Sequence, residues 1–159
     1  MPLRSKVKGP APCDAAVEKD IIDEALTFFK PLIFFRQYEI KSGADRVLVY
    51  LVLYIIECLK KLHKCSNKSA AIKELNQMAS AKFPLPGEQG FPVGLGSMYQ
   101  KPKSPSESDQ MRAYLTQLRT ELGNRLVEKV YETDQASKWW LCFSKKRFLD
   151  QSLSLPGAF

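Results

Sequence analysis

The pattern of apolar and polar positions along the chain predicts helices over most of its length. Residues 20–30 read DIIDEALTFFK, with apolar side chains at helical spacing and Asp20 in the position of an N-cap. Because proline lacks the amide proton that a helical turn needs, we expect an end or a kink at Pro31. A second apolar piece, LIFFRQYEI at 32–40, follows.

The strongest helical pattern lies at 42–65, SGADRVLVYLVLYIIECLKKLHKC. Ser42 begins it, and lysines at its end suit the negative pole of the helix dipole. Its middle is apolar on every side, which is typical of a helix at the centre of a core. The uncharged apolar run at 47–56 is much shorter than the roughly 20 residues that a membrane span requires. We therefore expect no membrane insertion.

The second half of the chain predicts two more helices separated by a loop. Residues 66–83 form an amphipathic pattern with Ile72, Leu75, Met78 and Ala79 on one side. Residues 83–108 are rich in proline and glycine and predict a long loop. Ser106 and Asp109 resemble a capping box, and an apolar stripe runs from Met111 to Val130.

Composition agrees with one globular domain. The 159 residues are 45% hydrophobic and 26% charged, which is ordinary for a folded domain of this size. Residues 1–17 contain three prolines and no apolar periodicity, so we expect an irregular N-terminal arm. The predicted fold is mainly α: a single compact helical domain, 1–159, of about five helices with the long Pro/Gly-rich loop.

The sequence contains few groups that could form a catalytic or metal site. His63 is the only histidine, and it lies at a basic helix end with no nucleophile motif beside it. Cys58, His63 and Cys65 match no common zinc spacing. The glycine-rich stretch GEQGFPVGLGS at 87–97 lacks the Lys-Ser/Thr ending of a phosphate-binding loop. We predict no catalytic residue, no bound cofactor and no metal.

The formal net charge of +7 is informative about partners and leaves nucleic acid, anionic lipid and acidic protein surfaces open. The stretch SKWWLCFSKKRFL at 137–149 combines aromatic rings with Lys145, Lys146 and Arg147 and has no acid. It could stack on nucleic-acid bases, lie on a membrane or contact a protein. Alternatively, Trp139, Cys142 or Phe143, and Phe148 could form the inner face of a last helix.

Several collinear stretches carry a resemblance to a known family. They are KGPAP at 8–12, DIIDEALTFFK at 20–30, FFRQYEIK at 34–41, ADRVLVYLVLYIIECLKKL at 44–62, FPLPGEQGFP at 83–92, MRAYLTQLRTELGNRL at 111–126 and SKWWLCFSKKRFLDQSLSLPG at 137–157. Together they resemble subunit 3, the 21-kilodalton subunit, of the actin-related protein 2/3 complex.

The resemblance implies a mainly helical, non-catalytic subunit of a seven-subunit assembly that nucleates branched actin filaments. It implies packing on actin-related protein 3, contact with actin-related protein 2 in the active state, and partners that include the other subunits and the actin filament. It also implies a cytoplasmic location in the actin cytoskeleton and no cofactor of this chain's own.

Two hypotheses follow for the exposed residues. In the first, the chain is a structural subunit that contacts partners through the loop with Gly9, Pro10 and Pro12, the loop with Pro84, Pro86 and Phe91, and the cations Lys145, Lys146 and Arg147, with the tryptophans, Trp139 and Trp140, bracing these cations from behind. In the alternative, the same aromatic and basic residues form a nucleic-acid-binding module, which would depend on the tryptophans and weaken steeply with salt.

Overall fold

The first helix, α1 (Ile21–Leu32), begins and ends where the sequence predicts. The computed structural model describes residues 1–154, so residues 155–159 of the expected domain lie outside the described residues. Asp20 caps α1 through hydrogen bonds from the Ile22 and Asp23 amides, and Asp23 completes a capping box. Pro31 lies in the last turn, and the helix ends one residue later at Leu32, so the predicted end is met within one residue.

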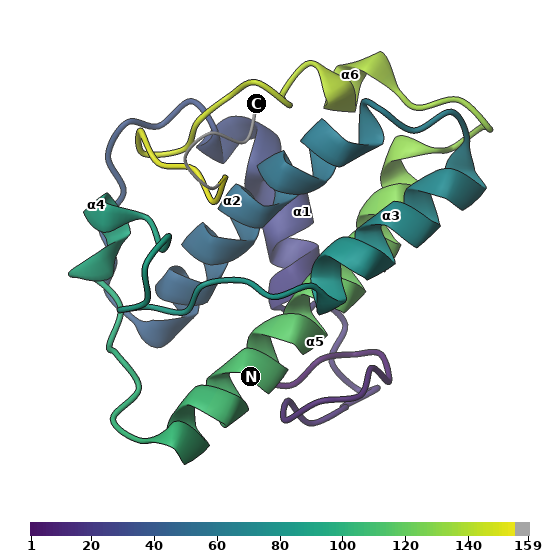
Figure 1. Ribbon diagram of the computed structural model, residues 1–159. Coiled ribbons are helices and arrows are strands. Elements are labelled where there is room, and N and C mark those ends of the chain that lie inside the picture. Colours follow the sequence, from purple (N-terminus) through teal and green to yellow (C-terminus); the bar gives the residue numbers. More distant parts are fainter. Residues whose placement is uncertain (155–159) are drawn as a thin grey trace.

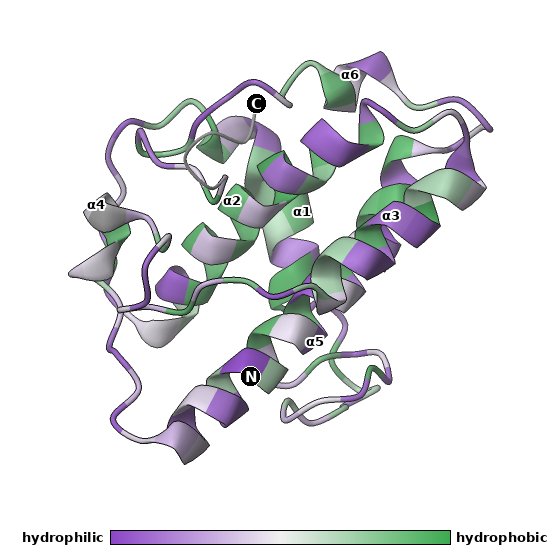
Figure 2. Ribbon diagram, in the orientation of Figure 1, coloured by the Kyte–Doolittle hydropathy of each residue, from purple (hydrophilic) through white to green (hydrophobic). Residues whose placement is uncertain are grey.

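The central helix α2 (Gly43–Leu62) is surrounded by the rest of the protein. Ser42 and Asp45 form its capping box. All nine side chains from Leu48 to Ile56 are buried, so the prediction of a central core element is confirmed. Figure 2 shows hydrophobic residues along the middle of α2 and hydrophilic residues towards its ends. The fully apolar middle therefore reflects contact on every side.

Two further helices, α3 (Lys68–Ser80) and α5 (Pro105–Val130), lie side by side and cover one side of α2 (Figure 1). The buried side of α3 consists of Ala71, Leu75 and Ala79. The expectation that Ile72 faces the core is wrong, since it is 39% exposed. The predicted stripe on α5 is confirmed for its leucines and Val130, which are buried.

The segment predicted as a long loop, 83–108, contains more regular structure than expected. It includes the single turn α4 (Val93–Gly96), and α5 begins at Pro105. The start at Ser106 is wrong by two residues, because Ser104 is the N-cap and accepts a hydrogen bond from the Glu107 amide. Proline at the first helical position loses no hydrogen bond, so it starts the helix rather than preventing it.

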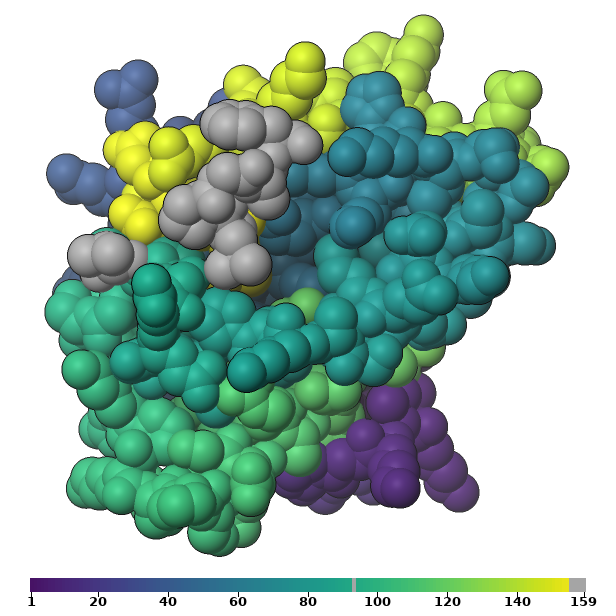
Figure 3. Space-filling view, in the orientation of Figure 1, coloured from purple at the N-terminus to yellow at the C-terminus, as the bar shows by residue number. Residues whose placement is uncertain are grey.

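The C-terminal part is mostly irregular. A single turn, α6 (Lys138–Leu141), stands where a last helix was considered, and the chain then passes over the C-terminal end of α1 (Figure 1). The space-filling view places the N-terminal arm and the C-terminal segment at opposite edges of the molecule (Figure 3). Within residues 1–154, six helices, two of them single turns, thus make a single helical domain, and the predicted mainly α fold is confirmed.

Candidate interaction surface

The loop of the N-terminal arm is held by one buried side chain of α5. The Gln117 side chain is 2% exposed; its amide nitrogen donates to the carbonyls of Val7 (2.9 Å) and Ala11 (3.1 Å), and its oxygen accepts from the Ala11 amide (2.8 Å). A Cβ at Gly9 would overlap the Gln117 side chain, so this close approach requires glycine. The predicted residues Gly9, Pro10 and Pro12 are exposed on this loop.

A buried ionic cluster fixes the beginning of the same arm. Arg125 donates to both carboxylate oxygens of Asp20 at 2.7 Å and to Glu121 at 2.6 Å, and Arg4 donates to Asp23 at 2.6 Å. Burial alone would raise the pKa of Asp20, but the hydrogen bonds from Arg125 and from backbone amides outweigh it and lower that pKa to about 2. The arm, α1 and α5 are therefore joined by charges that satisfy one another.

The loop after α3 presents fewer exposed residues than predicted. Pro84 is half-buried, whereas Pro86 and Phe91 are buried. The expectation that Pro86 and Phe91 are exposed contacts is wrong, because both belong to the packed inner side of the loop. Phe91 packs edge-on against Tyr99 at 5.5 Å between ring centroids. This contact joins the chain before α4 to the chain after it.

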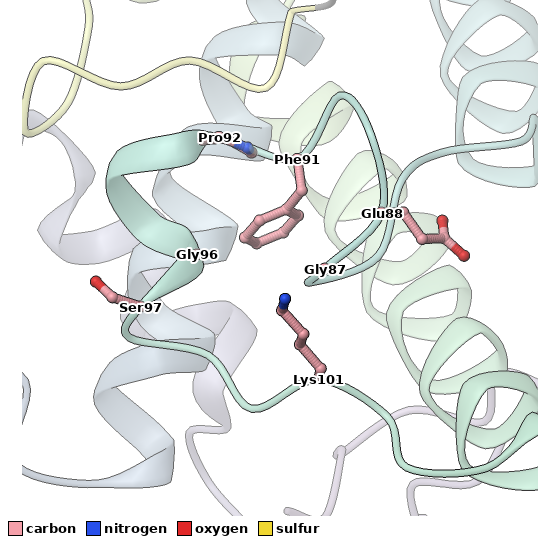
Figure 4. Close-up of a pocket in the computed structure, with 7 residues that line it drawn as sticks. All are labelled: Gly87, Glu88, Phe91, Pro92, Gly96, Ser97 and Lys101. Carbon is pink, nitrogen blue, oxygen red and sulfur yellow. The ribbon is translucent and has the colours of Figure 1, made fainter.

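A shallow hollow of about 420 Å³ lies beside this loop (Figure 4). Phe91 forms its wall, Gly87 its rim, and the Lys101 side chain reaches into it, while Glu88 points away. Gly87 has a φ of 91°, a conformation that favours glycine, and the Lys101 stem lies against it. The carboxylate of Glu88 instead pairs with Arg112 and accepts from the Leu85 amide. The hollow thus offers one cation in an open setting.

A second buried side chain of α5, Arg119, positions the loop after α3 and was missed in the sequence. It is 7% exposed, donates to the Met78 carbonyl at 2.7 Å, and lies 4.0 Å from the ring centroid of Phe83 and 4.6 Å from that of Tyr54. Ring faces and the carbonyl end of α3 offset its charge in place of a carboxylate. An arginine within a helical stripe gives no sequence signal of such burial.

Among the described residues, the C-terminal stretch holds the most exposed of the large hydrophobic side chains. Trp139 is 70% exposed, so the idea that it braces the cations from behind, or faces the core, is wrong. Trp140 provides the anchor instead, stacked on Phe29 of α1 at 5.9 Å. Cys142 is exposed and Phe148 is buried outside any helix, which excludes an inner helical face with Trp139. The predicted cations Lys145, Lys146 and Arg147 are exposed.

Among residues 1–154, no group of three or more histidine, cysteine, aspartate or glutamate side chains could hold a metal ion. His63 is exposed at the C-cap of α2. Burial raises the pKa of the Cys58 thiol, which keeps it protonated. Within the same residues, no helix combines the length and apolarity that a membrane crossing needs.

This protein presents exposed loops and exposed aromatic side chains on a helical scaffold, an arrangement typical of helical domains that bind other molecules. The chain belongs to the family described as P21-Arc, the ARP2/3 complex ARPC3 (21 kDa) subunit, whose model matches residues 1–153. The resemblance seen in the sequence is confirmed, and members of this family are structural subunits of a cytoskeletal complex.

Relatives from distant organisms match almost the whole chain. A Caenorhabditis elegans protein named "Probable actin-related protein 2/3 complex subunit 3" is 53% identical over 99% of this chain and 85% of its own length. Proteins named actin-related protein 2/3 complex subunit 3 are 48% identical in Dictyostelium discoideum, over 96% of this chain and 87% of their own, and 46% identical in Schizosaccharomyces pombe, over the same shares.

Proposed function

We propose that this chain is the non-catalytic structural subunit 3 of the actin-related protein 2/3 complex. In this role it packs on actin-related protein 3 and stabilises the active arrangement with actin-related protein 2, from which a branched actin filament is nucleated. The observation that carries the proposal is the family match over residues 1–153. Its partners are the other subunits and the actin filament, and its location is the cytoplasmic actin cytoskeleton.

The exposed residues supply candidates for the contacts. Gly9, Pro10 and Pro12 project from a loop that Gln117 holds rigid, so little conformational entropy is lost when a partner binds. Pro84 lies on the outer side of the second loop, while Pro86 and Phe91 support that loop from within. Trp139, Lys145, Lys146 and Arg147 form the third candidate contact.

A native purification tests the proposal. The chain, tagged and expressed at its normal level, is recovered under mild conditions from its own cells and analysed by sizing and mass spectrometry. We expect one large particle that contains two actin-related proteins and the remaining subunits. Recovery of the 18.1 kDa chain alone, or with nucleic acid, would overturn the proposal.

A branching assay tests the contact residues. Reversal of charge at Lys145, Lys146 and Arg147 should slow filament branching by the reconstituted complex, because complementary charge speeds and orients association. Reversal at Lys73 and Lys103, which are also exposed, is the matched control. Unchanged branching by the triple variant would remove these cations from the contact.

A further inference from the structure

Two segments far apart in the sequence form one surface at the end of α1. Phe29 packs on Trp140 and, edge-on at 5.6 Å, on Phe143, and Phe143 in turn contacts Phe34 at 6.1 Å. These contacts bring residues 28–37 against residues 137–147. The sequence pattern indicated only the second segment, because Phe34 lies in an apolar piece that resembles core. We call Lys30, Phe34, Lys138, Trp139 and Lys146 the aromatic–basic surface.

The aromatic side chains of this surface are exposed to an unusual degree. Phe34 is 66% exposed and Trp139 is 70% exposed, and the neighbouring Phe35 is 54% exposed. Rings of this size gain most from burial, and exposed clusters of them mark interaction sites. Phe34 rests on Phe143, which packs against Phe29, and Trp139 directly precedes Trp140, which is stacked on Phe29, so both exposed residues are attached to one packed cluster.

Within the described residues, the cations of the two segments that carry this surface, 28–37 and 137–147, have no acidic partner. Residues 28–37 and 137–147 contain six lysines and arginines and no aspartate or glutamate. Within residues 1–154, none of these six side chains forms a salt bridge, whereas Arg4, Arg112 and Arg125 all do. The local positive charge is therefore left for a partner to offset.

The arrangement of the lysines distinguishes among acidic partners. The ammonium nitrogens of Lys138, Lys146 and Lys30 lie over the rings of Trp139, Phe34 and Trp140, at 5.7, 5.6 and 4.4 Å from the ring centroids. A nucleic-acid base needs a free aromatic face on which to stack, and the faces of these rings are already covered by ammonium groups. The single turn of α6 is also too short for a helix that lies in a membrane interface. Carboxylates can reach the same ammonium groups without displacing them from the rings.

We infer that the aromatic–basic surface docks an acidic protein surface that brings apolar side chains against Phe34 and Trp139. The inference rests on the proposed function, because a neighbouring protein of the assembly supplies the partner. Carboxylates of the partner pair with Lys138 and Lys146, and its apolar side chains cover the exposed parts of the two rings. Such a contact combines charge steering with an aromatic anchor.

The test measures how the full chain joins the actin-related protein 2/3 complex from which this subunit has been removed. Three double variants are compared with the unchanged chain: Lys138→Glu with Lys146→Glu, Lys138→Gln with Lys146→Gln, and Phe34→Ser with Trp139→Ser. The matched controls are Lys73→Glu with Lys103→Glu, and Ile72→Ser, which alter exposed side chains elsewhere.

We expect the Lys138→Glu with Lys146→Glu variant and the Phe34→Ser with Trp139→Ser variant to bind at least tenfold more weakly than the unchanged chain. Both controls should stay within twofold of the unchanged chain. The glutamine variant should bind more weakly than the controls, and its affinity should depend less on salt than that of the unchanged chain. Full-strength binding by all three variants would overturn the inference while leaving the proposed function intact. Failure of the unchanged chain to join would instead overturn the proposed function.

Two further probes address the other partner classes. A single-stranded oligonucleotide and phosphatidylserine vesicles are each titrated into the full chain while tryptophan fluorescence is followed. We expect neither probe to show saturable binding that depends on Phe34 and Trp139, as judged by comparison with the Phe34→Ser and Trp139→Ser variant. Saturable binding to either probe that this variant abolishes would overturn the inference in favour of nucleic acid or membrane.

Discussion

The two ends of α1 carry charge in opposite ways. At its N-terminal end, Asp20 is fully buried as a side chain and pairs with Arg125 at 2.7 Å. At its C-terminal end, Lys30 lies over the ring of Trp140. No aspartate or glutamate occurs in residues 28–37 or 137–147, the two segments that carry the aromatic–basic surface. The charges at the N-terminal end are paired within the chain, whereas those at the C-terminal end have no carboxylate partner among the described residues. The comparison separates charge that the fold requires from charge that remains available to a partner.

Removal of Arg125, at the N-terminal end of α1, should cause the largest loss of stability. The Arg125→Leu variant leaves Asp20 and Glu121 buried without their cation, and breaking a buried pair in this way costs about 3–5 kcal/mol. Urea denaturation followed by circular dichroism measures the free energy of unfolding. The control is Lys41→Leu at the exposed pair with Glu39, where we expect a loss of about 1 kcal/mol or less. Equal losses at the two positions would contradict this view of the buried cluster.

Acid should weaken the same cluster by a smaller amount. The pKa of Asp20 is about 2 in the folded protein, below the ordinary value of 3.8, so its contribution is fully present above pH 4 and is lost as pH falls towards 2. A depression of this size corresponds to about 2 kcal/mol. Unfolding free energies measured between pH 5 and pH 2 should show this loss, and Asp20→Asn should show a flatter profile. A profile that is the same in both proteins would contradict the assignment.

Changes at the aromatic–basic surface should affect stability least. Lys138→Gln with Lys146→Gln removes two exposed charges that have no acidic partner in the described chain, so we expect a change within about 0.5 kcal/mol. Thermal unfolding of this variant and of the unchanged chain gives the comparison. A loss as large as that of Arg125→Leu would mean that these lysines belong to the fold rather than to an interface.

The sequence predicts most of the fold because local signals and burial agree in the longer helices. Ser42 and Asp20 are caps with the right chemistry, and the apolar middle of α2 allows only a central position. Pro105 shows where this reasoning fails, since a proline-rich stretch indicated a loop although the residue begins α5. Ser104 carries the better local cap signal, since Pro105 suits the first helical position and Glu107 the third, so the error came from treating every proline in this stretch as a loop residue.

The candidate contacts are less predictable because burial is decided by contacts between distant segments. Adjacent tryptophans look alike in the sequence, yet Trp140 packs on Phe29 and Trp139 does not. Phe34 and Phe91 each lie in an apolar stretch, but only Phe91 is buried. Gln117 and Arg119 are ordinary helix residues until the arm and the loop after α3 fold against them. These assignments require the tertiary arrangement.

Amide hydrogen exchange, compared between the free chain and the chain in the assembled complex, tests the contrast most directly. Residues 121–125 should be strongly protected in both states, because they lie inside α5 with their backbone hydrogen-bonded and largely buried. Residues 137–147 should exchange rapidly in the free chain and gain protection on assembly. No gain of protection over 137–147, with new protection confined to other surfaces, would contradict the claim that the aromatic–basic surface is where this subunit docks.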